Sequence, residues 1–383
     1  MKKWLILLSC FLLGACASMP PPRADGLFND QLFSAPSQPI SAAEVFAISP
    51  PMRKFLASPE IVHQMHAYGS QRGLFDALYS KGQLRLEYDS VQTRNAAQTF
   101  EARSGNCLSL VIMTAAFARQ LGLPVRFQRV LMDESWTRNG DIYFASGHVN
   151  LTLGKKMTDA DTRYDQSRLM TIDFLPPEDI TGQRIADLAE ATVVAMYMNN
   201  RAAETLAAGQ LDDAYWWARE AIRQDPNFLS SYNTLGVIYR RHGNLGEAEQ
   251  ALRRVYEREP NNTVVMFNLQ AALKDLGRTA EAQALATRLA QLQPEAPFHY
   301  FSLGMEAMRA GDFKAAKALF TKELARDPYY HEFQFWLGIA CLRLGETDEA
   351  VQHMAIALEN STTHRDHELY AAKLDRLKAQ LPH

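Results

Sequence analysis

The chain is organised around one stretch, Ala102-Arg-Ser-Gly-Asn-Cys-Leu-Ser-Leu-Val-Ile-Met-Thr-Ala-Ala-Phe-Ala-Arg-Gln-Leu-Gly-Leu-Pro124. A polar turn that contains glycine opens directly into an apolar helix, which we expect to end at Gly122, with Pro124 two residues beyond. A helix that is apolar on nearly every side lies in the middle of a domain. Cys107 falls in the first turn of this helix, where unpaired backbone N–H groups and the positive end of the helix dipole favour the thiolate over the thiol. The stretch therefore predicts a nucleophilic cysteine on a buried, rigid element.

Three strands are expected after this helix. The first runs over residues 125–131 and the second over residues 142–153, with a polar loop at residues 133–140 between them. The third carries Asp173 in the run Met-Thr-Ile-Asp-Phe-Leu. Because side chains alternate along a strand, the second strand points one set of residues away from its apolar face. That set comprises His148, Asn150 and Thr152.

His148 and Asp173 are the candidate partners of the cysteine. His148 is the only histidine between Cys107 and the repeats that follow. If the thiol has an imidazole partner in this part of the chain, that partner is therefore His148. A carboxylate within an apolar strand must be paired, because burying an unpaired charge is costly. Orienting a histidine is such a pairing.

These residues resemble the core of the transglutaminase-like superfamily of cysteine enzymes. The family pattern is a Gly-x-Cys turn, a buried helix ending in Leu-Gly-Leu-Pro-Val, a strand bearing His and a strand bearing Asp, and all four parts occur here in order between about residues 85 and 175. The resemblance implies a papain-like α+β fold over residues 41–176. It also implies a catalytic site of Cys107, His148 and Asp173 with Gln98 as a candidate oxyanion donor. The family's aromatic residue two positions after the His is Asn150 here, a difference that concerns subsite shape more than chemistry.

The N-terminus resembles a bacterial lipoprotein signal. A short apolar run follows Met1-Lys2-Lys3 and is too short to span a membrane. It ends in Leu13-Gly-Ala-Cys16, which resembles a lipobox and implies removal of residues 1–15 and lipidation of Cys16. Because Ala17 follows rather than Asp, the sorting rules for lipoproteins imply an outer-membrane protein that faces the periplasm. Residues 16–40, rich in Pro, Ser and Ala, are expected to form a lipidated tether.

Composition limits the classes of function. The chain of 383 residues is long enough for two domains, and its net charge of −3 becomes −5 when Lys2 and Lys3 are removed, which leaves no basic excess for nucleic acid. Of four cysteines, Cys107 and Cys341 remain in the folded part, and we do not expect a disulfide between them because Cys341 falls on a remote repeat helix. We expect Cys341 to be a buried packing residue. No metal or other cofactor is expected.

The second half of the chain repeats every 34 residues, as the positions of its Pro, Gly and Ala residues show. After a helical connector at residues 177–194, five tetratricopeptide repeats are expected over residues 195–364, capped by a helix at residues 365–383. Partner binding is expected on the concave face, where Asn233, Arg240 and Lys274 are candidates, with simple solvation of these side chains as the alternative. The repeated positions are Pro226, Pro260, Pro294 and Pro328; Gly209, Gly243, Gly277, Gly311 and Gly345; and Ala214, Ala248, Ala282, Ala316 and Ala350.

Two classes of function follow from the sequence. In the first, an envelope lipoprotein cleaves peptide or carboxamide bonds through a thioester at Cys107, and its repeats bind a protein partner. The thioester is resolved by water, as in a peptidase or amidase, or by an amine, as in a transamidase; water is the expected acceptor because nothing in the sequence indicates a lysine tunnel. In the second, the protein is a non-catalytic repeat adaptor that gathers envelope proteins.

Overall fold

The computed structural model describes residues 26–79, 84, 86–89, 92–139, 142–154, 169–174, 184–328, 330–361 and 363–379. The predicted signal peptide and Cys16 lie outside these ranges. Within them, none of the helices combines the length and the apolar character needed to cross a membrane.

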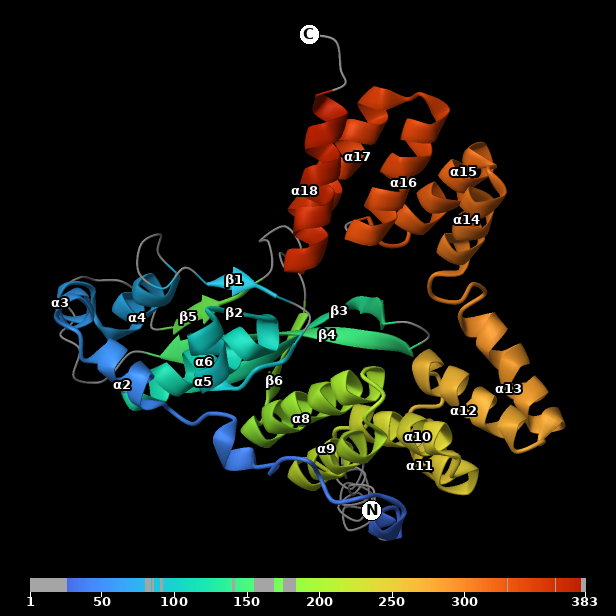
Figure 1. Ribbon diagram of the computed structural model, residues 1–383. Helices are drawn as coiled ribbons and strands as arrows, with labels where there is room; N and C mark the ends of the chain where they lie inside the picture. Colours follow the sequence, from blue (N-terminus) through green and yellow to red (C-terminus); the bar gives the residue numbers. More distant parts are fainter. Residues whose placement is uncertain are drawn as a thin grey trace, which may run out of the picture.

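The first half of the chain places helices around a small sheet (Figure 1). Its central helix, α6 (Cys107–Gln120), is buried along almost its whole length, as its apolar sequence predicts. It ends at the left-handed Gly122, and it packs against β4. The other elements of this half are α2 (Pro50–Leu56), α3 (Pro59–Tyr68), α4 (Ser70–Tyr79), β1 (Glu87–Tyr88), α5 (Ala96–Ala102), β2 (Ser104–Gly105), β3 (Val125–Asn139), β4 (Ile142–Gly154), β5 (Leu169–Ile172) and β6 (Arg184–Leu188).

The main sheet has the strand order β5-β4-β3-β6, and all of its neighbouring strands are antiparallel. The predicted polar loop at residues 133–140 is wrong, because β3 continues through Asn139 and its second part pairs with the beginning of β4. An irregularity in register lies between Val130 and Ser135. Backbone hydrogen bonds hold an antiparallel pair of strands together even when the side chains are polar. The polar sequence of residues 133–139 therefore did not predict this part of the hairpin.

The helical connector predicted at residues 177–194 is helical from Glu190 onward, but it differs from the prediction at residues 184–188. Residues 184–188 form the edge strand β6, which pairs with β3 from Phe127↔Leu188 to Leu131↔Arg184. Helix begins only at Glu190. A five-residue segment is too short for its periodicity to distinguish a strand from a helix. Here the segment becomes a strand because it pairs with the backbone N–H and C=O groups along the edge of β3.

Paired helices at the predicted 34-residue spacing form the second half (Figure 1). The glycine between the two helices of each unit has a positive φ, between 73° and 92°, which a side chain would disfavour. This backbone requirement explains why glycine recurs at that position. The pairs are α8 (Glu190–Ala207) with α9 (Leu211–Gln224), α10 (Ser230–His242) with α11 (Leu245–Arg258), α12 (Thr263–Asp275) with α13 (Thr279–Leu292), α14 (His299–Ala310) with α15 (Phe313–Leu324), and α16 (His331–Leu344) with α17 (Thr347–Glu359), followed by α18 (His364–Lys378).

The hydrophobic core does not follow the predicted domain boundary. One continuous cluster joins residues of α6, such as Phe117, to Met198 of α8 and Ile222 of α9, and it reaches the start of the third repeat at Val265 of α12. Separate clusters hold the third repeat and the last two repeats with their capping helix. The first two repeats are therefore part of the same folded body as the sheet, whereas the later repeats have cores of their own.

Residues 26–37 are not a free tether. Leu27 is 1% exposed and Phe33 is 7% exposed, and the Phe33 ring stacks on Tyr215 with the ring centroids 3.9 Å apart. Polar contacts with the first two repeats secure this segment: the Tyr239 hydroxyl donates to Leu27 O at 2.9 Å, and Trp216 Nε1 donates to Ser34 O at 2.6 Å. Burial of Leu27 and Phe33, together with these hydrogen bonds, therefore docks the segment on the repeats.

Candidate functional site

The turn before α6 has a structural reason for each of its residues. A Cβ atom at Gly105 would lie 2.7 Å from Ser109 Cβ, so the turn can close only with glycine at this position. Asn106 is the N-cap of α6, and its Oδ1 accepts hydrogen bonds from Ser109 N at 2.9 Å and Ser109 Oγ at 2.8 Å. The following residue, Cys107, is thereby held at the first position of the helix with a partly exposed, free thiol.

Cys107 at the start of α6, His148 on β4 and Asp173 directly after β5 lie together. His148 Nε2 is 2.5 Å from Asp173 Oδ1, and the side chains of both residues are more than nine-tenths buried. The Cys107 side chain lies close enough to the His148 imidazole to raise its pKa. A carboxylate can only accept, so Nε2 carries a proton toward Asp173 and Nδ1 is the ring nitrogen left for the thiol.

Two opposing influences set the protonation of His148. Burial lowers its pKa, but the hydrogen bond to Asp173 and the contact with Cys107 outweigh burial and raise the pKa of His148 to about 9. The imidazolium is therefore the favoured form at neutral pH. A protonated imidazole beside a thiol is what an ion-pair mechanism of a cysteine nucleophile requires.

Asn150 has a structural role that sequence reasoning missed. Its Nδ2 donates to Asp173 Oδ2 at 2.7 Å, so His148 and Asn150 together hold both oxygens of the carboxylate. Asn150 is only 4% exposed, and its Oδ1 has no hydrogen-bond partner among the described residues. The signal was present in the sequence, because strand alternation places Asn150 on the same side of β4 as His148.

Gln98, the candidate oxyanion donor, instead caps a helix in the structure. Its exposed side chain lies on α5, where Oε1 accepts a hydrogen bond from Asn95 N at 3.1 Å while Asn95 Oδ1 accepts from Gln98 N at 2.9 Å. This reciprocal pair is a capping box for α5. The geometry thus supports a capping role for Gln98, and no contact described for it reaches Cys107.

The three candidate partner-binding residues lie on first helices of the repeats, as expected. Two of them already have protein partners: Asn233 Oδ1 accepts from Asn268 Nδ2 at 2.9 Å, and Arg240 Nε lies 2.6 Å from Asp275 Oδ2. Lys274, near the end of α12, is exposed. It is therefore the most accessible of the three charged or polar side chains.

Cys341 is fully buried, as the sequence predicts, and burial raises the pKa of its thiol to about 11. With Glu349 and His353 it forms a group whose potential ligand atoms lie within 4.8 Å of one another. The Lys317 ammonium, however, donates to Glu349 Oε2 at 2.6 Å, so a cation of the protein itself already neutralises this carboxylate. Among the described residues this is the group that comes nearest to a metal site, and we assign no metal to it.

Comparison with known proteins identifies tetratricopeptide repeats in two segments of the second half. Residues 217–250 and 301–364 match two family models, each described as a tetratricopeptide repeat. Both matched segments lie within the paired helices, so the chain contains tetratricopeptide repeats, as predicted. The cluster of Cys107, His148 and Asp173 lies outside both of them.

Solved structures of repeat proteins resemble about half of this chain. A thermophilic TPR protein from Thermus thermophilus, TTC0263, is 20% identical, and the match covers 47% of this chain and 98% of that one with a TM-score of 0.29. YrrB, described as a TPR protein with an unusual peptide-binding site, is 19% identical, with coverage of 47% and 92% and a TM-score of 0.26. No curated protein matches the sequence.

Proposed function

We propose that this protein is a scaffold whose tetratricopeptide repeats bind a protein or peptide partner. The observation that carries this proposal is the array of paired helices at a 34-residue period, two segments of which match tetratricopeptide-repeat models. Stacked repeats present a long surface that suits extended protein segments. A non-catalytic adaptor, which is the simpler of the two functions that the sequence predicts, needs nothing more than this surface.

Two features of the repeat array support a partner site on the later repeats. The first two repeats share the core of the sheet, and residues 26–37 cover part of their surface. The third to fifth repeats have their own cores. We therefore assign partner binding to the first helices of the later repeats, α12, α14 and α16, where Lys274 is exposed.

A second function is favoured by a separate observation: His148 is hydrogen-bonded to Asp173, and the nearby Cys107 side chain raises the pKa of the imidazole. In this function the chain has a papain-like, transglutaminase-like core. The Cys107 sulfur forms a bond to a peptide or carboxamide carbon, and the backbone N–H of Cys107 donates to the oxyanion. His148 Nδ1 passes its proton to the leaving amine as the C–N bond breaks. Water then attacks the thioester, which releases a carboxylic acid and restores the thiol.

The place of action is part of the same proposal. Lipid on Cys16 would hold the protein at the outer membrane on its periplasmic side, so that the partner and the substrate are envelope proteins or peptides. This assignment rests on the pattern of residues 1–17 in the sequence. It is tested by mass spectrometry of the mature N-terminus, which is expected to show a lipid-modified Cys16.

Full-length variants separate binding from chemistry. Lys274→Glu is expected to reduce the recovery of cross-linked partners from envelope extract, whereas Lys314→Glu, the same charge change on the second helix α15, should not. Cys107→Ala should recover the same partners but yield no thioester and no cleaved product. If Lys274→Glu and Lys314→Glu recover partners equally, the binding surface is misplaced. If wild-type protein never forms an acyl adduct at Cys107, the adaptor is the correct function.

A further inference from the structure

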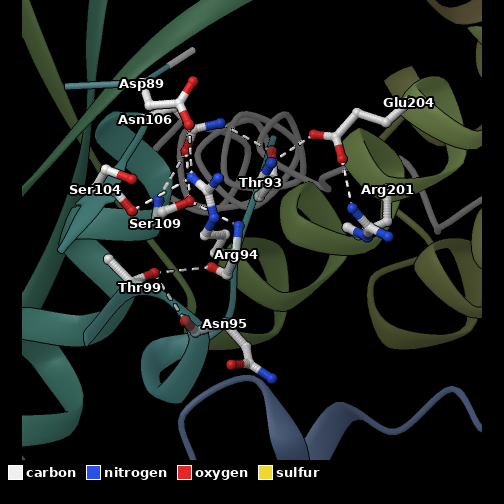
Figure 2. A network of polar contacts seen from close by, with 10 residues as sticks. All are labelled: Asp89, Thr93, Arg94, Asn95, Thr99, Ser104, Asn106, Ser109, Arg201 and Glu204. Atoms are coloured by element: carbon white, nitrogen blue, oxygen red, sulfur yellow. Dashed lines mark hydrogen bonds and ion pairs between the residues drawn. The ribbon is translucent and has the colours of Figure 1, made fainter. Parts of the chain in front are cut away.

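A chain of hydrogen bonds joins α8, the first helix of the first repeat, to α6, the helix that carries Cys107 (Figure 2). Its centre is Thr93, which is 1% exposed and lies in the segment before α5. Thr93 N donates to Glu204 Oε1 on α8 at 2.7 Å. On the other side, Asn106 Nδ2 donates to Thr93 Oγ1 at 2.9 Å. A single residue thus connects α8 to the cap of α6.

The members of this hydrogen-bond chain have further polar partners. Thr93 Oγ1 accepts a second hydrogen bond from Asn200 Nδ2 of α8 at 3.2 Å. Glu204 is also paired with Arg201, whose NH1 lies 2.7 Å from Oε2. Burial raises the pKa of Glu204, so its ionised form depends on these donors. These contacts favour one arrangement of the half-buried carboxylate and its partners, because moving Thr93 or Asn106 would leave a buried polar group unpaired.

Asn106 links these hydrogen bonds to the position of the Cys107 thiol. Its Oδ1 caps α6 and its Nδ2 faces Thr93, so the side chain can satisfy both groups only in one orientation. Cys107 is the next residue in the chain. Loss of the Thr93 hydroxyl would leave an amide donor unpaired at a residue that is only 9% exposed. The cap would then reorient, and the first turn of α6 with it.

We propose that Glu204 and Thr93 are positioning residues for Cys107, so that the first tetratricopeptide repeat is a working part of the thiol site rather than a separate module. The proposal deepens the second function given above and rests on it. It also explains why the first repeat shares a core with α6. A partner that shifts α8 would alter the reactivity of Cys107 through this chain of contacts.

The test compares alkylation of Cys107 by iodoacetamide in full-length variants, followed by mass spectrometry over a range of pH. Thr93→Val removes the hydroxyl at constant shape, and it is expected to slow Cys107 about fivefold, corresponding to about 1 kcal/mol for a lost cap, and to shift the pH profile. Thr93→Ser keeps the hydroxyl and should restore the rate. Glu204→Gln, which removes the charge, is expected to slow Cys107 as well, and it serves if Thr93→Val fails to fold.

The matched control is Thr192→Val. Thr192 is also on α8, and its hydroxyl donates to Asp225 Oδ2 at 2.6 Å, away from the site. This variant should lower the melting temperature comparably while the rate and pH profile of Cys107 stay unchanged. The proposal is overturned if Thr93→Val reacts as fast as wild type, or if Thr192→Val slows Cys107 equally. If wild-type Cys107 reacts no faster than glutathione, the nucleophile assignment fails, and the positioning role fails with it.

Discussion

Asp173→Asn tests the electrostatics of the candidate site directly. Burial alone would lower the pKa of His148, and the hydrogen bond to the Asp173 carboxylate is the largest influence that raises it. Asparagine keeps the shape of the side chain but carries no charge. The pKa of His148 is therefore expected to fall from about 9 to its ordinary value of 6.5 or below.

The size of the effect follows from the same values. The interval from 6.5 to about 9 corresponds to roughly 3 kcal/mol of stability contributed by His148 and its partners. Because the folded-state pKa is raised, this contribution is fully present below about pH 6.5 and is lost as the pH rises through about 9. In Asp173→Asn most of this pH dependence should be absent.

Two measurements check this prediction. NMR titration of ring-labelled histidine gives the midpoint for His148, and urea unfolding at pH 6 and pH 10 gives the change in stability. Asp187→Asn is the matched control, because Asp187 lies in the same sheet but forms an exposed pair with Arg126. A wild-type midpoint near 6.5, or the same midpoint in wild type and Asp173→Asn, would refute the argument.

Three further predictions concern single sites. Iodoacetamide at mildly acidic pH should modify Cys107 much faster than Cys341, because Cys341 is buried with a pKa of about 11, and equal rates in the folded protein would contradict an activated nucleophile. Gly105→Ala should destabilise the protein by about 1–3 kcal/mol in thermal unfolding because its Cβ meets Ser109, whereas Gly246→Ala, which meets nothing within 4 Å, should not. Phe33→Ala should cost about 3 kcal/mol and expose residues 26–37 to proteolysis, and unchanged protection would show that Phe33 does not anchor the segment.

The sequence predicted the features that depend on near neighbours along the chain. The 34-residue spacing gave the paired helices, because each inter-helix turn needs a glycine with positive φ and each unit repeats the same local geometry. The apolar run after Cys107 predicted a buried helix, and alternation in β4 placed His148 and Asn150 on one side. These are properties of segments of about 10 to 35 residues.

Only the tertiary structure decided which distant segments meet. It brought Asp173 to His148, gave Asn150 a place beside the carboxylate, and joined Thr93 to Glu204, which is 111 residues away. It also turned residues 184–188 into a strand and docked residues 26–37 on the repeats, against the local composition. Strand pairs and buried polar contacts form between segments far apart in the chain, and their stability depends on the residues of the partner segment. Periodicity within one segment carries no information about that partner.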